Sequence, residues 1–198
     1  DLPLEAAKNT AGQALLALIK ARALPFGFDM QIEKGIPLSS GLGGSAASAV
    51  AAVVAANAML DEPLTRIELL KVAMEGEAVA SGSRHADNIS PSLFGGLVLT
   101  VGIDNPRVKP VPVPKGIQAV IVHPPMFLST KQARAILKRE VTMSDFVWQT
   151  ANLAGFMELV LADPSLQIKS GVQWGLFGSA VYQLGTKSLW SDELFTMA

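Results

Sequence analysis

The sequence contains no cysteine, which excludes disulfide bonds and thiolate metal sites and fits a reducing compartment. It also lacks an excess of either charge, because 16 basic residues face 17 acidic ones and the formal net charge is −1. That balance offers no electrostatic attraction for nucleic acid or for an anionic membrane. The longest apolar stretch, residues 46–60, is mostly alanine and shorter than the about 20 residues that span a bilayer. No basic leader precedes an apolar run at the start of the chain. These absences predict a soluble, cytoplasmic protein with neither a nucleic-acid nor a membrane partner.

What is present is a globular composition, with 49% hydrophobic and 17% charged residues in a chain of 198. That length suffices for one sizeable core or two small ones. The chain has no internal repeat and no low-complexity segment. It begins without Met, already close to a helical pattern, and we therefore expect that an N-terminal part is missing from it.

The hydrophobic pattern predicts an α+β fold. Apolar residues at helical spacing predict helices over residues 4–23, 45–60, 65–80, 131–138 and 146–161. The third of these begins at Thr65, which forms a capping-box signature with Glu68. Residues 45–60 are apolar on nearly every face, which is typical of a buried helix. Alternation predicts strands over residues 28–34, 97–101 and 117–122, with the proline-rich residues 102–116 as a connector.

A glycine-rich loop, residues 37–48, opens directly into the alanine-rich helix. Three glycines stand within residues 41–44, and such a loop is costly unless the backbone bends sharply or approaches something closely. A glycine loop at a helix N-terminus collects free N–H groups at the positive end of the helix dipole, where phosphate binds. Four hydroxyl groups in and beside this loop could contact phosphate or Mg²⁺: those of Ser39, Ser40, Ser45 and Ser48.

The glycine loop is not a Walker A loop, because no Gly-Lys-Ser/Thr follows. Two other interpretations of the loop remain. It matches the loose dinucleotide-binding pattern through Gly41, Gly43 and Ala46, but no apolar strand leads straight into it and Asp61 lies between two helices. A glycine turn that merely packs a helix closely is the structural alternative.

Glu77 and the segment around His85 form a second candidate group. Glu77 stands on an alanine-rich helix, where a carboxylate is costly to bury unless it meets a cation. Eight residues later, His85, Asp87 and Asn88 follow in a loop of small residues. Asp and Asn also favour plain turns through local hydrogen bonds. With a phosphate loop upstream, we favour a binding site.

Thr130 and Arg134 are four residues apart on an expected helix and so share one face. The arginine fork suits a carboxylate or a phosphate. The alternative is a solvated helix start with Ser129 as its cap.

These segments resemble the motifs of the homoserine kinases within the GHMP kinase superfamily. The glycine motif, residues 36–47 (IPLSSGLGGSAA), marks the superfamily. Residues 82–91 (GSRHADNISP) and 129–134 (STKQAR) narrow the resemblance to the homoserine kinases. The resemblance covers residues 3–164.

The resemblance implies ATP-dependent phosphorylation of the homoserine hydroxyl in threonine biosynthesis, with Mg²⁺ as the metal. The ATP phosphates would lie against a loop made of Pro37, Ser39, Ser40, Gly41, Leu42, Gly43, Gly44, Ser45 and Ala46. Ser45 and Glu77 would hold Mg²⁺, and Asn9 would lie on the nucleotide side.

On the substrate side the resemblance places His85, Asp87, Asn88 and Arg134 around homoserine, with Arg134 on its carboxylate. Thr130 would lie near the reacting hydroxyl, so Thr130 and Arg134 are the catalytic candidates. No dedicated carboxylate base is implied. A homodimer is among the assemblies that the resemblance allows.

The implied architecture is partial. Residues 1–101 would form a ribosomal S5 domain 2-like N-terminal domain, and residues 117–164 an incomplete ferredoxin-like C-terminal domain. The family's N-terminal segment and a late glycine-rich motif are absent, and residues 168–190 instead resemble a piece of acyl-CoA oxidases and dehydrogenases. Residues 165–198 are thus expected to be an atypical tail. A catalytically inactive nucleotide-binding module, another GHMP small-molecule kinase and, from the tail, an acyl-CoA-handling protein are the alternative functions.

Overall fold

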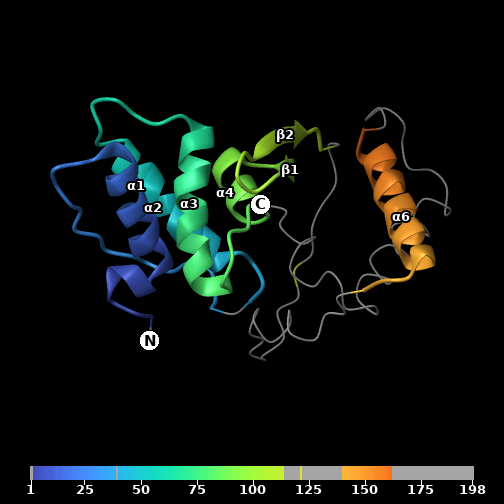
Figure 1. The fold of residues 1–198 in the computed structure, drawn as a ribbon, viewed down its shortest axis with the longest axis horizontal. Helices are drawn as coiled ribbons and strands as arrows, with labels where there is room; N and C mark the ends of the chain where they lie inside the picture. The colour runs from blue at the N-terminus through green and yellow to red at the C-terminus, as the bar shows by residue number, and fades with distance from the viewer. Residues whose placement is uncertain (1, 39, 114–120, 122–139, 162–198) are drawn as a thin grey trace.

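The computed structural model describes residues 2–38, 40–113, 121 and 140–161, and it mixes helices with a small sheet (Figure 1). The expected α+β class is confirmed. The elements in chain order are η1 (Ala6–Lys8), α1 (Thr10–Arg22), α2 (Gly44–Asn57), α3 (Arg66–Ser81), α4 (Ile89–Phe94), β1 (Leu97–Val101), β2 (Arg107–Val111) and α6 (Met143–Leu161).

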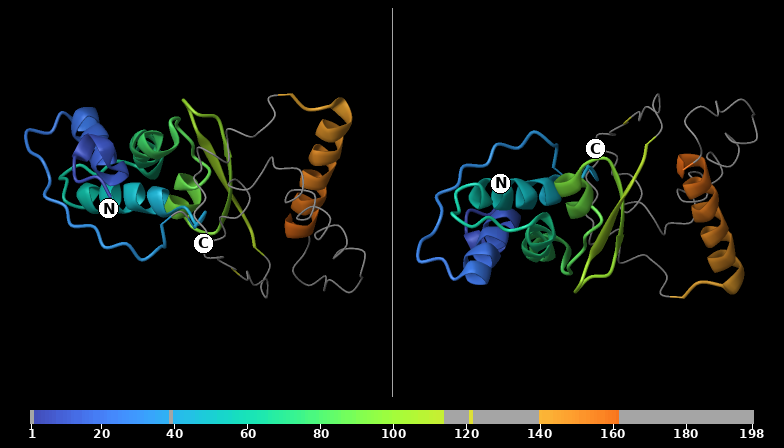
Figure 2. Two further views of the ribbon diagram at one scale, coloured as in Figure 1. Left: turned by 90° about the horizontal axis from the view of Figure 1, so that it is seen from below. Right: turned by 90° about the horizontal axis from the view of Figure 1, so that it is seen from above.

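A layer of three helices forms the main body. Helix α1 packs against both α2 and α3, α2 packs against α3, and the short α4 lies against α2, α3 and β1. The β1–β2 hairpin follows, and α6 lies on the side of the hairpin away from the three helices (Figures 1 and 2). The core is therefore made by α1–α4, with sixteen buried residues in one cluster.

The first helix starts later than the pattern predicts. In place of a helix over residues 4–23, a turn of 3₁₀-helix precedes α1, and Asn9 separates the two. The Asn9 side-chain oxygen accepts hydrogen bonds from the backbone N–H groups of Ala11 and Gly12, which caps α1. The helix ends at Arg22, before Ala23 in the left-handed conformation.

Helix α2 is buried on one face and not on nearly every face, so that expectation is wrong. Its buried residues are Ala46, Ala49, Val50, Ala52, Val53 and Ala56. The opposite face leaves Ala51, Val54 and Ala55 exposed. The helix also ends at Asn57 and not at residue 60. The Asn57 side chain bonds both backbone groups of Leu64, and this closes the connection to α3.

Helix α3 confirms its sequence signature. The Thr65 side chain accepts from the backbone N–H of Glu68, and the Glu68 side chain accepts from the backbone N–H of Thr65. Further along α3, Gly76 allows a close approach of its neighbours. A Cβ on Gly76 would clash with the backbone carbonyl of Thr10 and would lie 2.9 Å from Ala14 Cβ and 3.2 Å from Ala49 Cβ.

One strand prediction is confirmed, one is wrong, and one strand was not predicted. Residues 97–101 form β1 as expected, but the connector expected over 102–116 contains β2, which pairs antiparallel with β1 from Leu97 opposite Val111 to Val101 opposite Arg107. Pro110 conceals β2 in the sequence, because proline is tolerated only where a strand needs no ladder donor. Residues 28–34 form no strand, since no described strand pairs with them.

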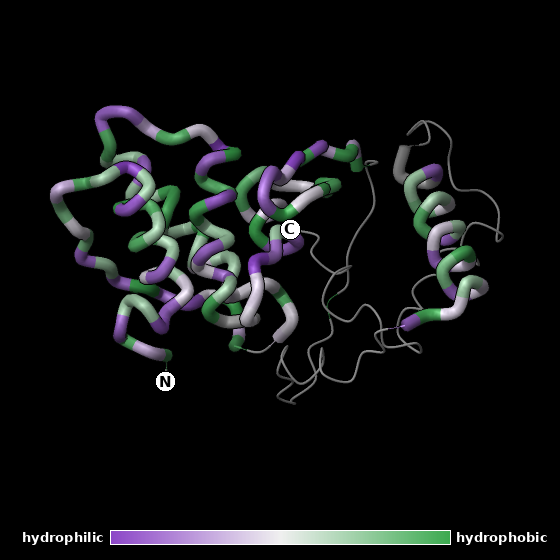
Figure 3. The backbone as a smooth tube through the Cα atoms, in the orientation of Figure 1, coloured by the Kyte–Doolittle hydropathy of each residue, from purple (hydrophilic) through white to green (hydrophobic). Residues whose placement is uncertain are grey.

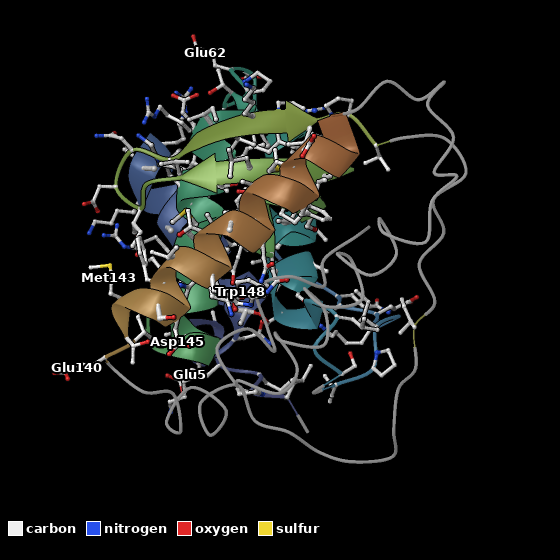
Figure 4. All side chains as sticks on the ribbon, turned by 90° about the vertical axis from the view of Figure 1, so that its right-hand side faces the viewer. Glu5, Glu62, Glu140, Met143, Asp145 and Trp148 are labelled. Carbon is white, nitrogen blue, oxygen red and sulfur yellow. The ribbon has the colours of Figure 1, made fainter. Side chains whose placement is uncertain are left out.

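Two further helices frame the rest of the described chain. Helix α4 was missed because Pro91 reads as a turn residue, although proline is tolerated in the first turn of a helix. Helix α6 begins after Thr142, whose hydroxyl accepts from the backbone N–H of Asp145. It crosses in front of the hairpin in Figure 4, with Met143 and Asp145 at its beginning. The strand expected over 117–122 and the helix over 131–138 lie outside the described residues, Ile121 apart.

The surface carries a hydrophilic bend between two of the helices. Hydrophilic residues gather on the outer bend of the connection between α2 and α3 (Figure 3). Arg22 reaches across to this connection and pairs with Glu62 at 3.2 Å. None of the helices described is both long and apolar enough to cross a membrane.

We predict that replacing Glu68 by Gln destabilises the protein at neutral pH and not in acid. The hydrogen bond from the Thr65 hydroxyl holds the pKa of the Glu68 carboxyl below its ordinary value of 4.5. A carboxyl with a lowered pKa contributes stability that is present above its unfolded pKa and is lost as the pH falls through its folded pKa. Urea unfolding of both proteins at neutral and acidic pH measures this difference. An equal loss at both pH values would contradict a contribution of the Glu68 charge to the cap.

We also predict that Gly76→Ala lowers the free energy of unfolding by about 1–3 kcal/mol, because the added methyl group meets backbone and small side chains that cannot move away. Gly155→Ala in α6 is the matched control. A Cβ there would meet no described atom within 4 Å. Its stability should stay unchanged or rise by up to about 1 kcal/mol, since alanine is the better helix former. Urea unfolding compares the two variants.

Candidate functional site

The glycine loop turns sharply immediately before α2. Gly41 and Gly43 both have left-handed backbone conformations, with φ of +72° and +68°. The Ser40 hydroxyl donates to the carbonyl of Pro37 at 2.8 Å and accepts from the backbone N–H of Leu42 at 3.4 Å. The Ser40 hydroxyl thus shapes the turn itself.

The N-terminus of α2 opens onto this loop. Gly43 is the N-cap and has no side chain to satisfy the first N–H groups of the helix. Gly44 begins the helix and Ala46 is buried in the core behind it. Uncapped N–H groups and the positive end of the helix dipole therefore face the loop, which suits an anion.

Ser45 and Glu77 meet at this end of the helical layer. The Ser45 hydroxyl in α2 donates to Glu77 Oε2 in α3 at 3.0 Å, across 32 positions of sequence. Glu77 is buried at 8% exposure, along the same stripe of α3 as Leu69, Leu70 and Ala73. A hydroxyl and a carboxylate are hard oxygen ligands, which suit Mg²⁺.

This donor pair fits a magnesium ion that keeps most of its other ligands from water and phosphate. Within residues 2–38, 40–113, 121 and 140–161, no three His, Cys, Asp or Glu side chains come together as a metal cluster. Mg²⁺ is typically held by one or two carboxylates together with phosphate oxygens and water. Ser45 and Glu77 are therefore the residues that could hold it.

Lys34 is a residue of this region that the pattern did not single out. Its ammonium group donates to the Gly44 carbonyl at 2.5 Å and to the Ser48 hydroxyl at 2.6 Å. Partial burial lowers the pKa of Lys34. Lys34 continues the alternation of Phe28, Met30 and Ile32, and the sequence pattern therefore assigned it to an expected strand and not to the site.

The loop over residues 82–88 brings the second group of candidates. His85, Asp87 and Asn88 are all half-buried. The Ser83 hydroxyl is 2.5 Å from His85 Nε2, and the backbone N–H of Asn88 donates to Asp87 Oδ1 at 3.1 Å. These local hydrogen bonds are the ones that a plain turn would make, and they also hold the polar side chains in place.

The structure brings this loop against the glycine loop. A Cβ on Gly43 would lie 3.3 Å from Asn88 Oδ1, so the two segments touch at this point. Arg84 ties the same loop to its surroundings through Glu75 on α3, at 3.3 Å, and Asp104 after β1, at 2.8 Å. The glycine loop, the Ser45–Glu77 pair and Asn88 therefore lie next to one another, as a single candidate site requires.

For the remaining candidate residues, the structure gives fewer contacts or none. The Asn9 side chain caps α1 and also donates to the carbonyl of Pro3 at 2.9 Å, so its contact with nucleotide stays a prediction. Pro37 is exposed and Leu42 half-buried in the loop. Ser39, Thr130 and Arg134 lie outside the residues that the structure describes.

Comparison with known proteins identifies the family that this chain resembles. Residues 9–96 match the family model of the GHMP kinases N terminal domain. The homoserine kinase of Xylella fastidiosa strain M12 is 55% identical over 161 residues, which cover 81% of this chain and 48% of that protein. The homoserine kinase of Chloroherpeton thalassium is 38% identical over 162 residues, covering 79% of this chain and 51% of that protein.

A solved structure shows the same relationship in three dimensions. The crystal structure of homoserine kinase from Cytophaga hutchinsonii matches with a TM-score of 0.78 and 38% sequence identity, covering 90% of this chain and 54% of that one. The chain thus spans about half the length of the curated relatives it matches. The resemblance read from the motifs is confirmed. That of residues 168–190 to acyl-CoA oxidases finds no support, and those residues lie outside the described part.

We predict that Gly43→Ala destabilises the protein more than Gly41→Ala. Both glycines have positive φ, so an alanine strains the backbone by about 1–2 kcal/mol at either position. A Cβ on Gly41 would meet nothing within 4 Å among the described atoms, whereas one on Gly43 would press on Asn88. Urea unfolding of the two variants isolates the contact with Asn88. Equal losses would mean that the two loops do not touch in solution.

Proposed function

Because residues 9–96 belong to the GHMP kinase N-terminal domain family, we propose that the protein transfers the terminal phosphoryl group of ATP to the side-chain hydroxyl of homoserine. The products would be ADP and O-phosphohomoserine, on the route to threonine. The observation that carries this proposal is the Ser45–Glu77 pair, which stands beside the uncapped N-terminus of α2 and the glycine loop. The reaction would run in the cytoplasm, and a homodimer is the proposed assembly.

The nucleotide side of the site is formed by backbone groups. The N–H groups of the glycine loop and of the first turn of α2 would donate to the ATP phosphates, and the helix dipole adds a favourable field. Gly41 and Gly43 let the backbone approach the phosphates without side chains in the way. Asn9, at the start of α1, would face the nucleoside.

Ser45 and Glu77 would hold Mg²⁺ beside these phosphates. The ion would neutralise negative charge on the phosphoryl oxygens. Glu77 is nearly inaccessible to solvent, and a buried carboxylate is stable only with donors or a cation around it. The Ser45 hydroxyl and the Glu77 carboxylate together offer two hard oxygen ligands beside an anion-binding helix end, which supports a metal there.

Homoserine would lie on the other side of the phosphates, against the loop over residues 82–88. His85, Asp87 and Asn88 offer both hydrogen-bond donors and acceptors to an amino acid. Arg134 would bind its carboxylate through the bidentate guanidinium, and Thr130 would lie near the reacting hydroxyl. The close approach of Asn88 to Gly43 supports this arrangement, because it brings the loop next to the backbone that would bind the phosphates.

The chemical step then needs positioning more than covalent help. The substrate oxygen would attack phosphorus in line as the bond to the ADP oxygen breaks, and the hydroxyl proton would pass to a phosphoryl oxygen or to water. Groups held at hydrogen-bonding distance reduce the entropic cost of bringing the two substrates together. Arg134 and Thr130 are the proposed catalytic residues, and no residue is assigned as the general base.

A nucleotide-binding module without turnover is the second candidate. It is favoured by one observation, that the glycine loop and the Ser45–Glu77 pair, which such a module needs, lie together in the structure. Such a module would bind Mg-ATP through the same loop and would leave homoserine unphosphorylated. Another GHMP small-molecule kinase is a weaker candidate, because the relatives compared above are all homoserine kinases.

Calorimetric titration with Mg-ATP, followed by an assay of homoserine-dependent ADP release, decides between these functions. We expect this chain to bind Mg-ATP and the full-length enzyme to release ADP when homoserine is present. We expect Glu77→Gln to weaken Mg²⁺-dependent ATP binding by about 10- to 100-fold, since it removes the anionic ligand and keeps the shape. Arg134→Ala should raise the KM for homoserine.

Glu62→Gln is the matched control, because Glu62 is an exposed acid on the connection at the far end of the helical layer (Figure 4). It should bind Mg-ATP like the wild type. Binding without ADP release would favour the module. An absence of Mg-ATP binding, or normal turnover in both Glu77→Gln and Arg134→Ala, would contradict the kinase proposal.

A further inference from the structure

Lys34 links a segment without strand pairing to the first turn of α2. Its ammonium group donates to the Gly44 carbonyl and the Ser48 hydroxyl, at 2.5 and 2.6 Å. The Ser48 hydroxyl donates in turn to the Gly44 carbonyl at 3.0 Å. Three polar groups thus form a closed cluster at the beginning of the helix, and Ser45 lies on the same turn.

Gly44 also lies close to the chain that precedes the glycine loop. A Cβ on Gly44 would lie 3.3 Å from Ile36 Cγ2 and 3.7 Å from Lys34 Nζ. The chain before the glycine loop therefore packs on the start of α2 at two points, one apolar and one charged. Any movement of this first turn would have to break both contacts.

The position of Lys34 is unfavourable for a lysine in two respects. A cation at a helix N-terminus stands at the positive end of the dipole. Burial also disfavours the charged form, which lowers the pKa of Lys34. The two short hydrogen bonds from the ammonium group must offset these costs, and charge-assisted bonds are among the stronger ones in proteins.

We propose that Lys34 is a positioning residue, which holds the first turn of α2 so that Ser45 faces Glu77 before the nucleotide arrives. Its ammonium group fixes Gly44 on one side of Ser45 and Ser48 on the other. This inference rests on the proposed function, because the site it positions is the Mg-ATP site. Lys34 acts through Gly44 and Ser48, and the phosphates are bound by the loop itself.

The test is a double-mutant cycle in Mg-ATP affinity, measured by calorimetry on the full chain. Lys34→Met keeps most of the aliphatic stem and removes the donors, and we expect about a 10- to 100-fold loss of affinity, as for a lost charged hydrogen bond. Combined with Ser45→Ala, the same change should cost much less, because the residue being positioned is already gone.

Two variants separate this effect from general instability and from loss of charge. Lys34→Arg retains donors and should restore part of the affinity. Lys20→Met removes an exposed lysine of α1 and should bind like the wild type. If Lys34→Met does not fold, Lys34→Arg and Ser48→Ala are compared with the wild type in its place. A loss of Mg-ATP affinity in Ser48→Ala would then support the proposal.

Amide hydrogen exchange without nucleotide tests the tether independently. We expect faster exchange over residues 44–48 in Lys34→Met, with unchanged exchange in α3. A wild-type chain that does not bind Mg-ATP would overturn the kinase proposal, while this exchange difference would still support the tether. Unchanged exchange, or additive losses in the double-mutant cycle, would overturn the role of Lys34.

Discussion

The close approach of three helices at Gly76 is the constraint on which the site depends. The carbonyl of Thr10, the methyl group of Ala14 and that of Ala49 leave no room for a side chain at this position. Because α1 and α2 come so near to α3 here, the next residue, Glu77, is carried into hydrogen-bonding distance of Ser45. Small residues thus set the distance between the helices, and that distance brings the Ser45 hydroxyl to the Glu77 carboxylate.

The candidate site places opposite charges on either side of one helical turn. The Glu77 carboxylate is buried on the α3 side of this turn, and the Lys34 ammonium is held at its start by Gly44 and Ser48. Both placements reduce stability relative to solvated charges, because burial disfavours the charged form. These polar groups are therefore held in position before a ligand binds. Polar groups that are positioned in advance are also what stabilises charge in phosphoryl-transfer sites.

Local signals predicted the elements that local interactions stabilise. The capping box at Thr65 predicted the start of α3, and alternation predicted β1. Residues 28–34 alternate just as clearly and form no strand, because a strand also needs a neighbour to pair with. Pro110 and Pro91 had the opposite effect, since each hid an element in which proline is tolerated.

The sequence alone predicted the glycine loop as a phosphate-binding candidate, and it singled out Glu77, His85, Asp87 and Asn88, because short motifs indicate a chemistry through the residue types they contain. Only the tertiary structure decided that Ser45 meets Glu77, that Asn88 lies against Gly43 and that Lys34 bonds the start of α2. Such contacts join residues distant in the chain. Their geometry follows from how closely helices pack, and packing depends on side-chain volumes summed over several elements and not on the pattern of any one.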